Sequence, residues 1–270
     1  MELCVFSKMF KDKNVQELIN LAHEYGFPGY DLCVRAGFPL NPRNVEHTLK
    51  DTVKLFKAEG VKINMITGEG SLLSPQDETA KPILSAMDKN NIRFLKLGYF
   101  RFDPVKDDYW KKVDNARKFL SGWEHLAREY NVKICCHTHS HLCLGLNCAS
   151  LMHLLKGFDP EFIGAYIDPC HMVIEGEDFA TGVSMAREYL EIVALKDVLL
   201  ERGSANNHGR KLRKVVPAGT GMVDWSAVFA ELRRIGYNGP LSVHCEFEVE
   251  ENRFYDTFRE ELRFFKGFLQ

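Results

Sequence analysis

The sequence lacks any long apolar run, and no segment approaches the roughly 18 consecutive apolar residues that a membrane-spanning helix needs. Its first residues, Met-Glu-Leu-Cys-Val-Phe-Ser-Lys, also lack a basic stretch followed by a long apolar one, the pattern of a secretory leader. We therefore expect a cytoplasmic protein with no membrane partner.

An excess of charge of either sign is also missing. The chain has 35 lysines and arginines and 37 aspartates and glutamates, which gives a formal net charge of -2. Such a balance excludes a general electrostatic attraction to DNA, RNA or an anionic membrane. The expected partner is a small, largely uncharged molecule and not a nucleic acid.

The 8 cysteines do not form the spaced framework of a short secreted protein. They lie inside apolar runs, as in Ile134-Cys135-Cys136, where free thiols pack like small hydrophobic side chains. We predict free thiols. Cys136, Cys170 and Cys245 flank the site described below, and buried structural thiols are the favoured interpretation for all three.

Short runs rich in Val, Ile, Leu and Phe alternate with stretches of helical periodicity, which is typical of a parallel sheet built from βα units. With 270 residues, 45% of them hydrophobic, the chain is long enough for one such domain over residues 1–270. The predicted strands, each followed by a predicted helix, cover residues 3–6, 29–33, 61–66, 92–97, 132–136, 162–167, 190–195 and 241–245.

Eight βα units in this length favour an α/β fold closed into a single (β/α)8 barrel, the TIM barrel. A doubly wound open sheet produces the same alternation, so periodicity alone does not separate the two folds. No Gly-x-Gly-x-x-Gly turn follows the first predicted strand, which counts against a dinucleotide-binding sheet. We predict the closed barrel.

Two of the predicted helices have clear end signals. Asn14 is the expected N-cap of the first helix and Gly26 its end. Asp224 and Gly236 are expected to have the same roles in the helix that precedes the last strand.

Polar residues gather just past the last four predicted strands. In such barrels the side chains at the C-terminal strand ends face the ligand. Alternation along an extended chain places His137 with His139, and His244 with Glu246, on a common side. The four stretches are His137-Thr-His139-Ser-His141, Asp168-Pro-Cys-His171, Lys196-Asp197 and His244-Cys-Glu246-Phe-Glu248.

His137, Asp168 and His244 are the predicted metal ligands. Two imidazoles and one carboxylate from three strands form a set with open positions, suited to Mn²⁺, Fe²⁺, Zn²⁺ or Co²⁺. The plainer alternative is that each residue is a polar strand end whose hydrogen bonds go to the neighbouring backbone. Several such residues at coincident strand ends favour the ligand site.

Two stretches carry a resemblance to a known family. Asp168-Pro-Cys-His171-Met is similar to an Asp-x-x-His motif on a sixth strand, and the stretch from Pro217 to Val243 is similar to a final loop, helix and strand. On these residues the chain resembles the xylose isomerase-like TIM barrel superfamily of sugar isomerases, ketose 3-epimerases, inosose dehydratases and metal-dependent endonucleases. The resemblance covers nearly the whole chain.

The resemblance implies a divalent ion held by Glu, Asp, His and Glu on strands five to eight, with the two glutamates also moving protons in the epimerases. His137, Ala194 and His244 stand where the first Glu, the His and the last Glu are expected, and only Asp168 is retained. Imidazoles preserve the capacity to bind metal while changing the site charge by about two units. Ala194, by contrast, removes one ligand.

Two functions follow from these departures. One is a metal-dependent isomerase or epimerase, or a related dehydratase or lyase, that abstracts a proton next to a carbonyl of a sugar-like substrate. The other is a catalytically degenerate barrel that binds a sugar-like ligand without turnover. An endonuclease IV-like nuclease is a minor third class, because Ala194 and the loop around Pro217 do not supply its additional metal ligands.

For the enzyme, Glu246, His139 and His171 are the candidate bases, since imidazoles and partly desolvated carboxylates work near neutral pH. His171 also resembles the family residue that contacts substrate oxygens, with a hydrogen bond to Asp168 as the alternative. Lys196 resembles the family lysine that would neutralise a developing oxyanion, with a buried ion pair as the alternative.

Asp197 and Arg35 complete the candidate substrate-binding residues with His171, although a solvated loop arginine is the plainer reading of Arg35. The basic stretch from Arg202 to Lys214 leads to Gly219-Thr-Gly221 and could hold a substrate phosphate through amides and cationic side chains, or be merely solvated. Family members associate in several ways, so the sequence is also compatible with a homo-oligomer.

Overall fold

Eight parallel strands close into a barrel in the order β1-β10-β7-β6-β5-β4-β3-β2 in the computed structural model, which describes residues 1–204 and 209–269. The pairing is parallel between all neighbours in this order. The predicted closed TIM barrel is confirmed. The barrel strands are β1 (Glu2–Phe6), β2 (Gly29–Cys33), β3 (Lys62–Thr67), β4 (Phe94–Lys96), β5 (Lys133–His137), β6 (Ile163–Ile167), β7 (Leu190–Leu195) and β10 (Pro240–Val243).

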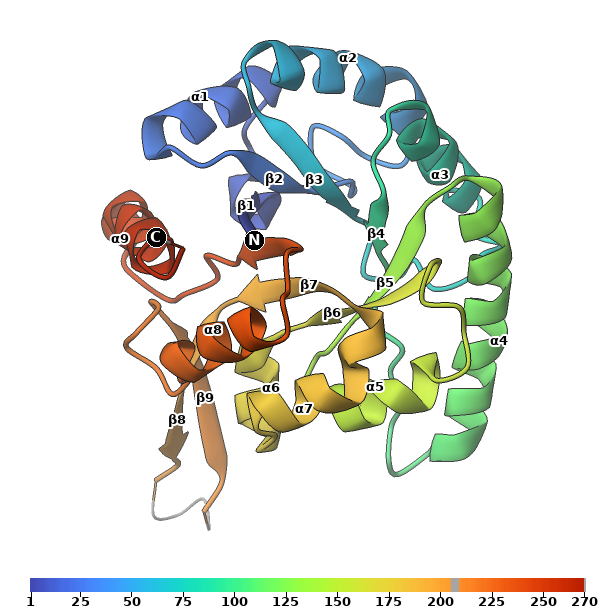
Figure 1. Ribbon diagram of the computed structural model, residues 1–270, viewed down its shortest axis with the longest axis vertical. Coiled ribbons are helices and arrows are strands. Elements are labelled where there is room, and N and C mark those ends of the chain that lie inside the picture. Colours follow the sequence, from blue (N-terminus) through green and yellow to red (C-terminus); the bar gives the residue numbers. More distant parts are fainter. Residues whose placement is uncertain (205–208, 270) are drawn as a thin grey trace.

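Helices form a ring around these strands (Figure 1). The first and last helices lie next to each other where this circle of helices closes. The aromatic rings of Tyr25 and Phe258 pack together there, with their centroids 4.8 Å apart. The helices are α1 (Val15–Tyr25), α2 (Val45–Ala58), α3 (Ala80–Lys89), α4 (Tyr109–Glu129), α5 (Cys148–Leu155), α6 (Pro169–Glu175), α7 (Phe179–Ala186), α8 (Trp225–Arg234) and α9 (Phe254–Lys266).

The predicted helix ends are confirmed. The Asn14 side chain accepts a hydrogen bond from the Glu17 amide, and the Glu17 side chain accepts one from the Asn14 amide, which is a capping box. Gly26 ends α1 in a left-handed conformation with φ 64°. Asp224 accepts from the Ala227 amide at the start of α8, and Gly236, with φ 69°, follows its end.

One prediction about the order of elements is wrong, because β7 is not followed directly by a helix. Residues of the expected basic loop form a two-stranded antiparallel sheet, β8 (Asp197–Arg202) and β9 (Lys211–Val216), which projects from the barrel (Figure 1). In this sheet Asp197 is paired with Val216 and Arg202 with Lys211. The two strands pair with each other instead of joining the barrel, so charged side chains along them stay exposed.

The barrel interior is filled by a small apolar cluster that is separate from the larger core between strands and helices. Met65, Cys135, Tyr166, Ile192 and Ala194 form this cluster, and none is more than 1% exposed.

All eight cysteines lie in the described residues and are free and buried, as predicted. Within the described chain, no helix combines the length and the apolar character needed to cross a membrane.

Asp197 fastens the loop between β9 and α8 to the end of β7. Its fully buried carboxylate accepts hydrogen bonds from the amides of Val198, Gly219, Gly221 and Val223 and from the Trp225 indole, at 2.8 to 3.2 Å. Charged acceptors with several donors make strong hydrogen bonds. These contacts give Asp197 a role in positioning the loop, and its expected role in substrate binding stays a prediction.

We predict that Asp197→Asn lowers the free energy of unfolding by about 2 to 4 kcal/mol. The loop amides and the Trp225 indole would lose their charged acceptor, and the side-chain NH2 group of the asparagine would face some of these donors. Urea unfolding followed by tryptophan fluorescence measures this loss. The control is Asp51→Asn, at an exposed position of α2. Equal stability of the two variants would contradict the role assigned to Asp197.

Candidate metal and substrate site

The C-terminal ends of the barrel strands open into a cavity of about 250 Å³. A neighbouring cavity of about 480 Å³ lies toward β9. Lys8, His139, Lys196 and Glu246 line both, so these four side chains form the boundary between them. The candidate site therefore lies where the sequence predicts it, at the strand ends.

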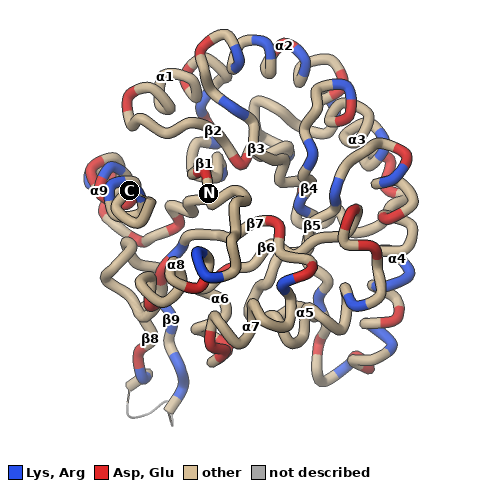
Figure 2. The backbone as a smooth tube through the Cα atoms, in the orientation of Figure 1, with Lys and Arg blue, Asp and Glu red and all other residues tan. Residues whose placement is uncertain are grey.

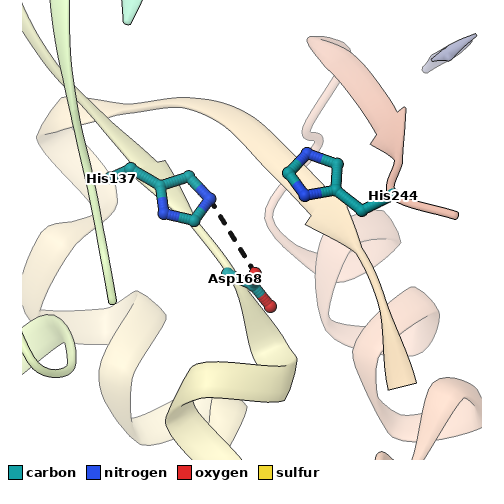
Figure 3. Close-up of side chains that lie close together, drawn as sticks. All are labelled: His137, Asp168 and His244. Atoms are coloured by element: carbon teal, nitrogen blue, oxygen red, sulfur yellow. Dashed lines mark ion pairs between the residues drawn. The ribbon is translucent and has the colours of Figure 1, made fainter. Parts of the chain in front are cut away.

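The three predicted metal ligands converge. His137 ends β5, Asp168 follows β6 and His244 follows β10, and one ligand atom from each lies within 4.8 Å of the others. The Nε2 atom of His137 is 3.8 Å from Oδ2 of Asp168. The two imidazoles lie nearly parallel, with an interplanar angle of 5°, and flank the carboxylate (Figure 3).

These ligand atoms have no hydrogen-bond partner among the described residues. Both ring nitrogens of His137, Nδ1 of His244 and Oδ2 of Asp168 are buried in this state. Buried polar atoms nearly always have a hydrogen-bond partner, so four atoms without one in the same place indicate a ligand site. A divalent cation fits this set, because two imidazoles and a carboxylate match the donors it prefers.

A hydrogen-bond chain orients His244 for such a role. Tyr166 lies with its hydroxyl 3.1 Å from Oδ2 of Asp31 and 2.7 Å from Nε2 of His244. Asp31 can only accept from the hydroxyl, so His244 donates its Nε2 proton to Tyr166. The tautomer inferred from this network leaves a lone pair on Nδ1, as in metal sites whose histidines donate the other N–H to a supporting group.

Asp168 is held by its other oxygen. Oδ1 accepts from the Cys170 amide at 2.9 Å and from the His171 amide at 3.4 Å, which makes Asp168 the N-cap of α6. The Asp168 amide in turn donates to the Thr138 hydroxyl at 2.8 Å. These hydrogen bonds fix the carboxylate, and its Oδ2 lies near His137 and Lys196.

Burial favours the neutral form of three imidazoles, those of His137, His139 and His171. It lowers the pKa of His137 far below that of a free imidazole, and the charge of Lys96 lowers it further. Burial and the charge of Lys196 likewise lower the pKa of His171, and they lower that of His139 to about 3. Neutral imidazoles can act as ligands or hydrogen-bond acceptors at physiological pH.

Lys196 links the remaining groups. Its Nζ lies 2.9 Å from Nε2 of His171, 3.1 Å from Oδ2 of Asp168 and 3.4 Å from Oε2 of Glu246. The approach to Asp168 is an ion pair without hydrogen-bond geometry, because that oxygen has no hydrogen-bond partner among the described residues. A metal ion on Asp168 therefore has to share the carboxylate with this ammonium or displace it.

The charge states of Lys196 and Glu246 depend on each other. Burial acts to lower the pKa of Lys196, but the attraction of Asp168 and Glu246 outweighs it and raises the pKa above the usual range. Burial acts to raise the pKa of Glu246, but Lys196 and His244 outweigh it and lower the pKa far below normal. Lys8, which the sequence analysis missed, completes the ion pair with Glu246.

The other predicted substrate residues have clear positions. His171 bonds through Nδ1 to the Ser140 hydroxyl at 2.9 Å, so both of its ring nitrogens have partners other than Asp168. His139 packs on Tyr99, with ring centroids 4.2 Å apart. Arg35 lines the cavity and donates from Nε to the Gly68 carbonyl at 2.9 Å.

The basic stretch that could hold a phosphate makes other contacts where the structure describes it. The Gly219 and Gly221 amides donate to Asp197, and Arg213 donates to the Ser140 hydroxyl at 3.1 Å. Lys211 donates to the Ile174 carbonyl. Residues 205–208 of this loop lie outside the described residues.

Lys96 is the most notable residue that the sequence analysis missed. It is the last residue of β4, is 2% exposed, and its Nζ has no hydrogen-bond partner in the described chain. The nitrogen lies 3.7 Å from the Tyr99 ring centroid, a cation–π contact. Burial and the charge of Arg35 lower its pKa to about 7. A lysine inside the apolar run of a predicted strand, at its C-terminal end, was the available signal.

With this geometry, the comparisons with known proteins are informative. The profile of the family described as xylose isomerase-like TIM barrel matches residues 19–268. The chain belongs to this family. An inosose dehydratase from Lacticaseibacillus casei is 25% identical over 148 residues, which cover 52% of this chain. The match spans 48% of that protein, so the chain matches about half the length of this curated relative.

Solved structures support the same fold. The 3-keto-D-glucoside 4-epimerase of E. coli has a TM-score of 0.75 at 16% identity, with 99% of each chain covered. The D-psicose 3-epimerase of Clostridium cellulolyticum H10 has a TM-score of 0.73 at 14% identity, with 100% of each chain covered. An IolI protein with a bound zinc atom has a TM-score of 0.74 at 17% identity, covering 100% of this chain and 96% of that one.

Ala194 is the departure from the family pattern that the structure explains least. Its fully buried methyl group packs in the barrel interior beside Tyr166 and offers no ligand atom. Along the helices around the barrel, Lys and Arg positions are interspersed with Asp and Glu positions (Figure 2).

We predict that Lys96→Met raises the free energy of unfolding at pH 7 by about 1 to 3 kcal/mol, because it removes a buried ammonium group and keeps a side chain of similar size. The pKa of Lys96 is about 7 in the folded chain against an ordinary 10.5. Between these values the unfolded chain binds more protons at this position, so wild-type stability rises with pH and the advantage of the variant shrinks.

Urea unfolding of chelator-treated protein at pH 7 and pH 9 measures this difference. Lys54→Met, at an exposed position of α2, is the matched control and should show no such pH dependence. A variant that is less stable than wild type at pH 7, or a stability difference that does not change with pH, would contradict the account.

Proposed function

We propose that the protein is a metal-dependent isomerase or epimerase, or a related dehydratase, that acts on a small sugar-like substrate by abstracting a proton next to a carbonyl. One observation carries this proposal: His137, Asp168 and His244 bring ligand atoms within 4.8 Å of one another, and each has a buried ligand atom without a hydrogen-bond partner among the described residues. Asp168 lies beside Lys196, and His137, His244, Lys196 and Glu246 line one cavity. The similarity of this chain to sugar epimerases and to an inosose dehydratase supports the same class.

His137, Asp168 and His244 would hold the ion, which we propose to be Mn²⁺, Zn²⁺, Fe²⁺ or Co²⁺. When bound, such an ion polarises a carbonyl or hydroxyl oxygen and stabilises negative charge on it. Asp168 is kept in place for this by its capping bonds, and His244 by its bond to Tyr166.

Glu246 is the proposed proton acceptor. Its carboxylate lines both cavities and is kept ionised by Lys8 and Lys196, so it carries no proton that has to leave first. The lowered pKa also makes it a weak base. Proton transfer to Glu246 therefore requires that Lys196 turn from the carboxylate toward the substrate oxygen as negative charge develops there.

Lys196 is the proposed group that stabilises the oxyanion. Its ammonium already lies among His171, Asp168 and Glu246, so a small rotation changes its partner without leaving the cavity. His171 is a positioning residue for Lys196, because its Nε2 accepts from the ammonium while Ser140 holds the opposite side of the ring. His139 is the alternative base on the same boundary.

A degenerate barrel that binds a sugar-like ligand without turnover is the second candidate. Two observations favour it: Ala194 supplies no ligand, and the ammonium of Lys196 lies 3.1 Å from the carboxylate oxygen that a metal would need. A protein of this kind would bind its ligand in the same cavity but would exchange no proton with solvent.

Solvent deuterium exchange separates the two candidates. We expect wild-type protein with added Mn²⁺ or Zn²⁺ to place deuterium on carbon in at least one ketose, inosose or keto-glycoside. Glu246→Gln should slow this by about 100-fold or more with little change in metal binding, because Gln keeps the size but cannot accept the proton. NMR of the recovered sugar gives the rate.

Glu250→Gln, at an exposed position four residues further along, is the matched control and should exchange at the wild-type rate. Equal exchange by wild type and Glu246→Gln would move the base to His139. Exchange with none of these sugars, with or without metal, would reject the enzyme in favour of the binding barrel.

A further inference from the structure

Positive side chains outnumber carboxylates around the 250 Å³ cavity. This local excess differs from the balanced charge of the whole chain, and it surrounds the place where a ligand has to lie. Five lysines and arginines line the cavity against two carboxylates: Lys8, Arg35, Lys96, Arg101 and Lys196 against Asp31 and Glu246.

The carboxylates are already used elsewhere. Glu246 pairs with Lys8 and Lys196. Asp31 is fully buried and accepts hydrogen bonds from three hydroxyls, those of Thr67 at 2.5 Å, Ser242 at 3.0 Å and Tyr166 at 3.1 Å. Neither carboxylate lies within ion-pair distance of the other three cations.

Those three cations, Arg35, Lys96 and Arg101, have no ion-pair partner within residues 1–204 and 209–269. Unpaired charge is expensive where the side chain is buried, as it is for Lys96. Burial lowers the pKa of Lys96 to about 7, and the repulsion of Arg35 contributes more than the attraction of Asp31. Lys96 Nζ is therefore buried near the charge of Arg35 and has no ion-pair partner among the described residues.

The three cations occupy one side of the cavity. Arg35 follows β2, Lys96 ends β4 and Arg101 follows β4, whereas the proposed metal ligands come from β5, β6 and β10. Strands β2, β3 and β4 are consecutive in the barrel, and β5, β6, β7 and β10 continue from them. A molecule that reaches both sets has to lie across the mouth of the barrel.

Fixed contacts hold the three cations in place. Arg35 is anchored through Nε to the Gly68 carbonyl, which leaves its terminal nitrogens for a ligand. The Tyr99 ring lies 3.7 Å from Lys96 Nζ and 5.9 Å from Arg101 Cζ. A backbone bridge to Cys143 positions Arg101 at the exposed edge of the cavity. Such positioned donors match the oxygen atoms of an anion.

We propose that Arg35, Lys96 and Arg101 form a subsite for an anionic group, a carboxylate or a phosphate, and that the substrate is a sugar acid or sugar phosphate. The substrate class rests on the proposed function, whereas binding of an anion at the subsite requires no turnover. It lies on the β2 to β4 side, away from the basic stretch from Arg202 to Lys214 that was considered for a phosphate.

Binding of matched sugars tests the subsite. The probes are D-glucose with D-glucuronate and D-glucose 6-phosphate, and D-fructose with D-fructose 6-phosphate, each titrated calorimetrically into wild-type protein. At least one anion should bind about 10-fold or more tightly than its neutral parent. A preference for glucuronate alone identifies a carboxylate subsite, and a preference for the sugar phosphates alone identifies a phosphate subsite.

Variants locate the preference. Lys96→Met and Arg35→Met should each weaken binding of the preferred anion about 10-fold and leave binding of the neutral parent unchanged. Lys54→Met should change neither. Circular dichroism and thermal unfolding confirm that each variant is folded. The proposal is overturned if neutral sugars bind as tightly as both kinds of anion, if no anion binds up to about 10 mM, or if folded Lys96→Met keeps the preference.

The same titrations with chelator-treated protein and with Glu246→Gln separate this inference from the proposed function. Anion preference without any deuterium exchange supports the subsite and rejects the enzyme. Exchange into neutral sugars without anion preference supports the enzyme and rejects the subsite.

Discussion

Closure of the parallel strands into a barrel brings the polar side chains at their C-terminal ends into one largely buried space. Each such group must find a partner there or remain costly. The structure meets this constraint in part: Asp31, Tyr166 and His244 share a hydrogen-bond chain, Asp197 binds the loop before α8, and Lys196 pairs with Glu246. Buried atoms of His137, Asp168, His244 and Lys96 that have no hydrogen-bond partner among the described residues mark the candidate site.

The imidazoles at positions 137 and 244 change the electrostatics of the site as well as its donor atoms. Where the resemblance leads us to expect two glutamates, imidazoles contribute no negative charge in either protonation state, and burial lowers the pKa of His137 far below that of a free imidazole. The cations of the cavity then outnumber its carboxylates. The proposed anionic ligand and the unusual metal ligands are therefore two consequences of the same replacement of carboxylates by imidazoles.

The sequence predicted the fold well because its signals are local. Strand periodicity, the Asn14 cap and the Gly26 helix end depend on nearby residues, and all were found. The convergence of His137, Asp168 and His244 was also predictable, since barrel geometry brings strand ends together wherever the strands are known. The hairpin of β8 and β9 was missed because an alternating charged stretch resembles a solvated loop until its partner strand is identified.

The remaining site residues depend on contacts between distant parts of the chain. Lys8 lies 238 residues before its partner Glu246, and Asp31 accepts from Ser242 across 211 residues. Asp197 was assigned to substrate because its sequence position suggests the cavity, whereas its carboxylate turns toward the loop amides. Only the folded chain shows which polar atoms have partners. Lys96 Nζ has no hydrogen-bond or ion-pair partner among the described residues, whereas Lys8 and Lys196 pair with Glu246.

The central claim is that His137, Asp168 and His244 form a metal site despite Ala194 and Lys196. Crystals grown with Zn²⁺ and measured on both sides of the zinc absorption edge test it directly. The account predicts one anomalous peak about 2.0 to 2.2 Å from an imidazole nitrogen of each histidine and from Asp168 Oδ2, with Lys196 moved off that oxygen. Absence of a peak there, with Lys196 still on Asp168, would contradict it.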